Sequence, residues 1–187
     1  MASDRPRWVA PLAFAVAAIG TGIAAAWFWA HPSNALIGTE PSELMVPWFY
    51  QACAFPPLGL LLTTAVIDVL STRRTAGLSA LALCAACSLV AVIRLAGLIP
   101  LSGHGLFLSA VIVFELMRET ERAPGALLTA VLGFLVTGYF KLFVWHDGVF
   151  FTASVVLGGA LAWAVSAMVL ARPRSGRYTR RLHDDPR

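Results

Sequence analysis

The sequence predicts an all-α polytopic membrane protein, a bundle of six transmembrane helices with both termini in the cytoplasm. Of its 187 residues, 58% are hydrophobic and only 13% are charged, whereas soluble domains carry about 25% charged residues. Six apolar segments approach the roughly 20 residues that an α-helix needs to cross a bilayer. The arginines gather in the connections on one side of these segments, which is the positive-inside pattern.

The six predicted helices make up a single domain, residues 1–171, followed by a basic tail, 172–187. Their connections are short, which indicates one compact bundle. The first apolar run is longer than the hydrophobic part of a signal peptide, so we expect it to be kept as a helix. The tail is expected to lie disordered against an anionic inner leaflet. The predicted helices span 8–30, 47–70, 76–99, 102–118, 125–145 and 149–171.

The basic residues set the predicted orientation. With both termini inside, all of the 14 lysines and arginines except Arg94 and Lys141 are cytoplasmic. Because they flank apolar runs, the net charge of +4 indicates a membrane topology and not a nucleic-acid partner. The predicted location is a cell membrane, of the bacterial inner-membrane type. The cytoplasmic set is Arg5, Arg7, Arg73, Arg74, Arg118, Arg122, Arg172, Arg174, Arg177, Arg180, Arg181 and Arg187.

The second predicted helix has an irregular start. Pro47, Pro56 and Pro57 flank the segment FYQACAF, and proline fits a first helical turn but breaks a helix interior. Either this helix is continuous, or it begins near Pro57 and residues 44–55 form a half-helix. Such a piece is tolerated at membrane depth only where it is packed in protein or lines a cavity. The preceding loop, 31–46, faces outside as a solvated connection or as a lid.

Other residues are expected to hold the bundle together. Asp68 is expected to pair with Arg73 or Arg74, and Glu115 with Arg118 or Arg122, near the inner ends of their helices. A small residue recurs at every fourth position of the last helix, which predicts close packing against a neighbour. These small residues are Ser154, Gly158, Ala162 and Ser166.

The third helix carries an arginine near its outer end. Cys84, Cys87, Ala91 and Arg94 follow one another at offsets of three, four and three, so they share one helix face. An arginine at this depth usually faces the bundle interior, a partner or water. The alternative is that Arg94 extends its head group to the outer interface.

The fourth helix begins in a turn suited to an anion. Ser102 is a natural N-cap, Gly103 lets a ligand approach the backbone, and His104 lies in the first turn. A helix N-terminus with free N–H groups favours negative charge. The turn therefore marks a candidate binding site at the outer face.

The turn after the fifth helix adds further polar groups. Lys141 is the only lysine, and His146, Asp147 and Gly148 form a predicted tight turn. Two histidines, two fixed cations and a helix N-terminus suit a phosphate ester. The cations would neutralise charge on phosphoryl oxygens, while one histidine attacks or acts as base and the other protonates the leaving oxygen. We expect no metal and no cofactor.

The tripeptide Ser102-Gly103-His104, which opens the fourth helix, resembles the second motif of the membrane type 2 phosphatidic acid phosphatases. The resemblance implies a membrane enzyme that acts on a lipid-linked phosphate at the outer face. It implies His104 as general acid, His146 as nucleophile and Asp147 as its orienter. Lys141 would stand in for the arginine of the third motif, and Arg94 is at best a substitute for the first. Lys141, Ser102 and Gly103 would bind the substrate.

A second resemblance leads to different chemistry. Cys53, Arg94 and His104 lie at the outer ends of successive predicted helices, an order similar to that of the exosortase and archaeosortase transpeptidases. This resemblance implies Cys53 as nucleophile, His104 as base and Arg94 as oxyanion or carboxylate partner. A third alternative is a small transport, assembly or accessory subunit whose outer polar groups bind a protein partner, a lipid head group or a proton.

Overall fold

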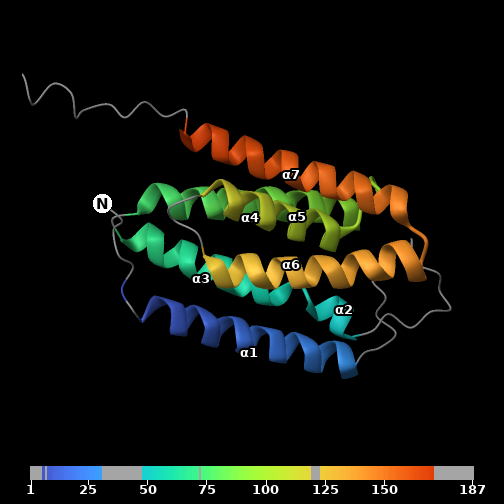
Figure 1. Ribbon diagram of the computed structural model, residues 1–187, viewed down its shortest axis with the longest axis horizontal. Helices are drawn as coiled ribbons and strands as arrows, with labels where there is room; N and C mark the ends of the chain where they lie inside the picture. The colour runs from blue at the N-terminus through green and yellow to red at the C-terminus, as the bar shows by residue number, and fades with distance from the viewer. Residues whose placement is uncertain (1–5, 7, 31–47, 72, 119–122, 171–187) are drawn as a thin grey trace, which may run out of the picture.

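The computed structural model describes Pro6 and residues 8–30, 48–71, 73–118 and 123–170, and these ranges contain helices but no strand (Figure 1). The predicted all-helical class is confirmed. The predicted outer loop and basic tail lie outside the described residues. The helices are α1 (Val9–Ala30), α2 (Trp48–Ala52), α3 (Phe55–Leu70), α4 (Arg74–Leu95), α5 (Gly103–Met117), α6 (Pro124–Tyr139), the π-helix η1 (Phe140–Val144) and α7 (Gly148–Leu170).

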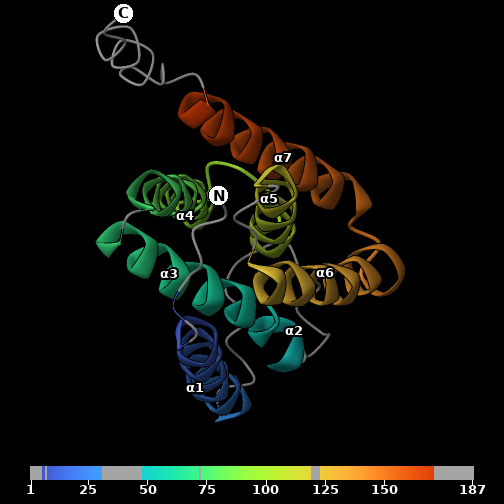
Figure 2. The same cartoon turned by 60° about the vertical axis from the view of Figure 1, so that its left-hand side comes forward.

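Five helical segments are long and apolar enough to cross a membrane, so the chain has the character of a membrane protein. They are α1, α2 with α3, α4, α6 with η1, and α7. The fourth predicted span corresponds to α5, which has only 15 residues and lies among the other helices (Figure 2). It packs mainly against α7 and α6, whereas α1 packs against α3 and α2 at one edge.

The second predicted span is broken into two helices. α2 ends at Ala52, and α3 begins at Phe55 with prolines in its first turn, where the missing N–H of proline costs no hydrogen bond. The half-helix α2 packs against α1 and α6, and its Tyr50 is 2% exposed. One face of α2, with Tyr50 and Ala52, is therefore covered by protein, as we expect for a half-helix at membrane depth.

A glycine stops α4 at Leu95, four residues before the predicted boundary. Gly97 has a φ of 73°, in the left-handed region, which is the usual position of glycine after a helix C-terminus. The N–H of Gly97 donates to the carbonyl oxygen of Arg94, and that of Leu98 to the carbonyl oxygen of Ile93. These two bonds form a Schellman motif. Arg94 is thereby fixed in the last turn of α4.

The small-residue stripe of α7 is buried, as predicted, and its Gly158 lies against α5. Ser154, Gly158, Ala162 and Ser166 are all buried. A Cβ added at Gly158 would overlap the carbonyl oxygen of Leu106 and the hydroxyl of Ser109. The missing side chain therefore lets α7 approach the backbone of α5 closely.

Gly158→Ala is expected to destabilise the bundle by about 1–3 kcal/mol, because the new methyl group overpacks a backbone contact. Gly159→Ala is the matched control, since a Cβ there would lie at an ordinary 3.6 Å from Cγ2 of Val113. Thermal unfolding in mild detergent measures both variants. Equal melting temperatures for the two would contradict the close packing of α5 and α7.

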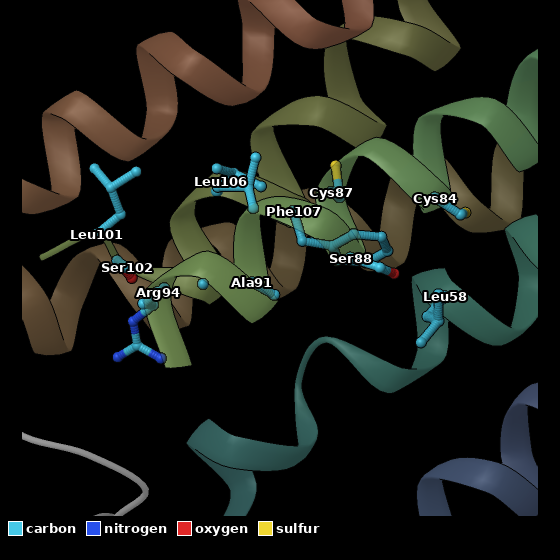
Figure 3. A pocket seen from close by; sticks show the side chains of 12 residues that line it. Leu58, Cys84, Cys87, Ser88, Ala91, Arg94, Leu101, Ser102, Leu106 and Phe107 are labelled. Carbon is cyan, nitrogen blue, oxygen red and sulfur yellow. The ribbon is translucent and has the colours of Figure 1, made fainter. Parts of the chain in front are cut away.

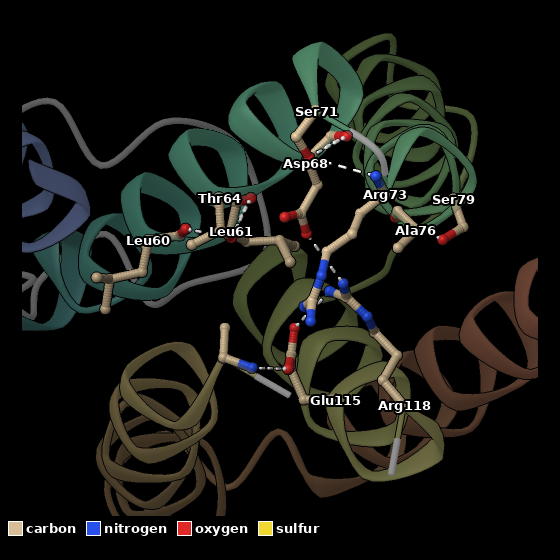
Figure 4. A network of polar contacts seen from close by, with 11 residues as sticks. Leu60, Leu61, Thr64, Asp68, Ser71, Arg73, Ala76, Ser79, Glu115 and Arg118 are labelled. Carbon is tan, nitrogen blue, oxygen red and sulfur yellow. Dashed lines mark hydrogen bonds and ion pairs between the residues drawn. The ribbon is translucent and has the colours of Figure 1, made fainter. Parts of the chain in front are cut away.

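A buried ion network joins α3, α5 and the start of α6 (Figure 4). Arg118 lies 3.2 Å from the carboxylate of Glu115 and 3.5 Å from that of Asp68. The second carboxylate oxygen of Glu115 accepts the N–H of Ala123, just before α6. The predicted Glu115–Arg118 pair is confirmed, and Arg118 adds a partner for Asp68 that the sequence did not indicate.

Candidate functional site

A pocket of about 160 Å³ lies between α3, α4 and α5 (Figure 3). Arg94 and Ser102 lie at one end of it, and Leu58 and Cys84 at the other. The predicted face of α4 is confirmed, since its four residues all line the pocket. The lining includes Cys84, Cys87, Ala91, Arg94, Leu106 and Phe107.

Arg94 brings a positive charge to the pocket. Within the part of the chain that the structure describes, its guanidinium forms no ion pair. Its Nη1 atom lies 3.9 Å from the position that a Cβ at Gly103 would take. The cation therefore lies beside the first residue of α5, where the helix dipole also favours an anion.

Ser102 caps α5 as predicted. Its hydroxyl accepts the N–H of Gly105 at 3.3 Å, and its own N–H donates to the hydroxyl of Ser154 at 2.7 Å. The N–H of this buried residue thus holds the turn against α7, while its hydroxyl oxygen caps α5. Its predicted role in binding substrate stays a prediction.

On another side of the α5 N-terminus, aromatic rings surround Tyr50. The Tyr50 ring lies 4.7 Å from that of His104 and 4.7 Å from that of Trp145, between ring centroids. It also contacts the ring of Phe140 in η1. We call these four residues the Tyr50 cluster. It connects the first turn of α5 with the turn between η1 and α7.

His104 has a defined ring orientation in this cluster. Its Nε2 atom lies 3.2 Å from the carbonyl oxygen of Gln51. A carbonyl only accepts, so Nε2 carries a proton, and in the neutral ring the lone pair lies on Nδ1. The contact with Gln51 and the neighbouring Tyr50 ring together fix the plane of the imidazole, so that a proton transfer would go through Nδ1.

Lys141 and Asp147 form an ion pair that closes the turn after η1. The Lys141 ammonium lies 3.0 Å from the Asp147 carboxylate and 5.1 Å from the centre of the Trp145 ring. Lys141 is 1% exposed, because the π-helix η1 turns its side chain inward. The charge of Lys141 is therefore matched by Asp147 in this conformation.

His146, which directly precedes Asp147 in this turn, is exposed. Its φ of 54° is in the left-handed region, which few residues other than glycine adopt, although Asn, Asp and His are enriched among them. The N–H of Asp147 donates to the carbonyl oxygen of Lys141 at 2.7 Å, and Trp145 N–H to that of Phe140. The predicted tight turn is thus present, and it holds His146 in a strained conformation.

Cys53 lies in the connection between α2 and α3 and directs its thiol toward α6. The sulfur is 3.0 Å from the carbonyl oxygen of Tyr50, 3.8 Å from that of Gly133 and 3.7 Å from the Thr137 hydroxyl. His104 reaches the same segment through Gln51. Cys53 does not line the pocket that contains Arg94.

The predicted site residues therefore fall into two groups around the start of α5. Arg94, Ser102 and Gly103 line the pocket, whereas His104 belongs to the Tyr50 cluster. Trp145 of that cluster connects it to the Lys141–Asp147 pair. Tyr50 was missed by the sequence reasoning. Its only signal was an aromatic residue between prolines, and aromatic residues are common at membrane interfaces.

Comparisons with known proteins do not test the roles predicted for these residues. The chain matches no protein-family model, and searches of curated proteins and of solved structures find no relative. The two family resemblances carried by short motifs therefore stay predictions.

Proposed function

We propose that this chain is an integral membrane enzyme that acts at the outer membrane face on a lipid-linked phosphate. The observation that carries the proposal is the position of Arg94. A cation with no carboxylate partner among the described residues lies beside the first turn of α5 and at one end of an apolar pocket. A lipid phosphate has the complementary form, an anionic head on an apolar chain.

In this proposal Arg94 binds the phosphoryl oxygens and stabilises the charge that develops on them. His146 attacks phosphorus, and the leaving alcohol oxygen takes the Nδ1 proton of His104 in its doubly protonated form, which leaves the neutral ring with its lone pair on Nδ1. Water then hydrolyses the phosphohistidine, releasing inorganic phosphate, and His104 recovers its proton. The Lys141–Asp147 pair acts by holding the turn that presents His146.

The proposal is tested by phosphate release from purified protein in vesicles that contain a lipid phosphate. His104→Gln is expected to lower the rate by about 10²–10⁴-fold, because it removes the proton donor. Arg74→Gln is the control, an exposed residue at the opposite end of α4. Undiminished release by His104→Gln would contradict the proposed mechanism.

A Cys53-dependent transpeptidase is the second candidate. It is favoured by the helix break at Cys53 and by the hydrogen bond of His104 to Gln51, two residues away. Cys53→Ala discriminates between the two, since it removes the nucleophile of the transpeptidase and leaves the phosphatase machinery intact. If neither Cys53→Ala nor His104→Gln changes any measured activity, an accessory membrane subunit is the better description.

We further propose that both termini lie in the cytoplasm and the pocket end of α4 faces outside, in a bacterial-type inner membrane. Val149→Cys, at an exposed position in α7, is then expected to react with a membrane-impermeant maleimide added to whole cells. Thr75→Cys, exposed at the other end of the bundle, is expected to react only after lysis. The reverse pattern would overturn the orientation.

A further inference from the structure

The pocket specifies more than an anionic head group. Resting on the proposed function, we infer that the substrate is the phosphate ester of a long-chain alcohol, with one hydrocarbon chain that begins next to the phosphate and enters the pocket between α3, α4 and α5. The hydrocarbon chain of the substrate and its link to the phosphate are set by the pocket, whichever histidine performs the chemistry.

The size of the pocket fits the first part of one chain. A cavity of about 150 Å³ lined by apolar side chains accommodates a benzene-sized guest, and this pocket has about 160 Å³. It therefore accommodates about six carbon atoms. Arg94 follows Cys84 by ten positions, which is about 15 Å along α4 at 1.5 Å per residue, so the pocket is elongated along the helix, as a hydrocarbon chain requires (Figure 3).

The lining next to Arg94 argues for a direct link between phosphate and hydrocarbon. Ala91, Leu101 and Gly103 adjoin Arg94, and none has a polar side chain. The hydroxyl and N–H of Ser102 already bond to Gly105 and Ser154. A glycerol diester would place its two ester groups beside the side chains of Ala91 and Leu101, which offer no hydrogen-bond donor, and this is unfavourable.

No acidic side chain lines the pocket among the described residues, so nothing there opposes an anion. The two thiols of Cys84 and Cys87 lie in its wall and report directly on its occupancy. Cys53 lies outside the pocket, against α6. The chain thus contains both a reporter and an internal control for a binding experiment.

The experiment follows alkylation of Cys84 by a small maleimide in the purified full-length protein, with sites resolved by peptide mass spectrometry. Ethyl, butyl, hexyl and octyl phosphate are the probes. We expect hexyl phosphate to slow Cys84 alkylation while the Cys53 rate stays constant. The alkyl phosphate concentration that gives half-maximal protection should fall about fourfold per methylene, because each methylene leaves water. It should level off beyond about six carbons, when the pocket is full.

Dihexanoyl phosphatidic acid tests the linkage, and it is expected to protect Cys84 more weakly than hexyl phosphate. Protection equal to or better than that of hexyl phosphate would overturn the inference, as would equal protection by hexanol. Ala91→Phe, which fills the pocket, should abolish protection, whereas Val92→Phe, on the exposed face of α4, should keep it. Protection lost in both variants or kept in both would contradict the assignment of the pocket.

The result is separable from the proposed function, since binding needs no turnover. If protection of Cys84 depends on alkyl chain length but no lipid yields phosphate, the proposed binding mode is supported and the proposed enzyme activity is contradicted. If phosphate release is unaffected by Ala91→Phe and by the alkyl chain length of the substrate, the proposed enzyme activity is supported and the proposed binding mode is contradicted.

Discussion

Arg118→Met is expected to destabilise the folded bundle by about 3 kcal/mol, the lower end of the cost of breaking a buried ion pair. The carboxylates of Asp68 and Glu115 are 1% and 0% exposed, and both lose a cation in this variant. The lower end applies because Arg73 also extends toward the network (Figure 4). Reversible unfolding in mixed detergent and dodecyl sulfate measures the difference.

The control for Arg118→Met restores the charge balance. The triple variant Asp68→Asn, Glu115→Gln, Arg118→Met removes all three charges and is expected to recover most of the lost stability, because buried pairs contribute little over neutral groups of similar volume. If Arg118→Met alone is as stable as the parent protein, the network does not hold α3, α5 and the start of α6 together.

Arg94→Gln is expected to lower the kcat/KM of phosphate release by about 10²–10³-fold, the usual effect of removing one donor to a developing oxyanion. The kcat/KM of Arg94→Lys should lie between those of the parent protein and Arg94→Gln, since lysine keeps the charge but lacks the planar fork that binds two oxygens. Arg94→Gln should leave the melting temperature unchanged, because the guanidinium forms no ion pair among the described residues.

Features set by neighbours along the chain could be predicted from the sequence. The capping serine Ser102 and the helix break before Pro57 depend on their immediate neighbours, and the shared face of Cys84 and Arg94 depends only on the period of one helix. The stripe of small residues through Gly158 could likewise be predicted, because its four-residue period is local. The end of α4 was placed too late because Gly97 was not recognised as its C-terminal glycine.

Features set by contacts between distant helices could not be predicted. The Lys141–Asp147 pair and the π-helix that buries Lys141 depend on how η1 packs against α7. The Asp68–Arg118 contact joins residues 50 positions apart. Tyr50 acquires its importance only because α2 brings it against His104 and Trp145.

The most direct test of the account is the binding of hexyl phosphate to the purified protein, followed by phosphorus NMR. We expect saturable binding by the parent protein and at least about tenfold weaker binding by Arg94→Gln, since charge-assisted hydrogen bonds to the phosphate are lost. Arg74→Gln should bind as the parent does. Equal affinity for Arg94→Gln and the parent protein, or no binding by the parent, would contradict the claim that Arg94 receives the phosphate of a lipid.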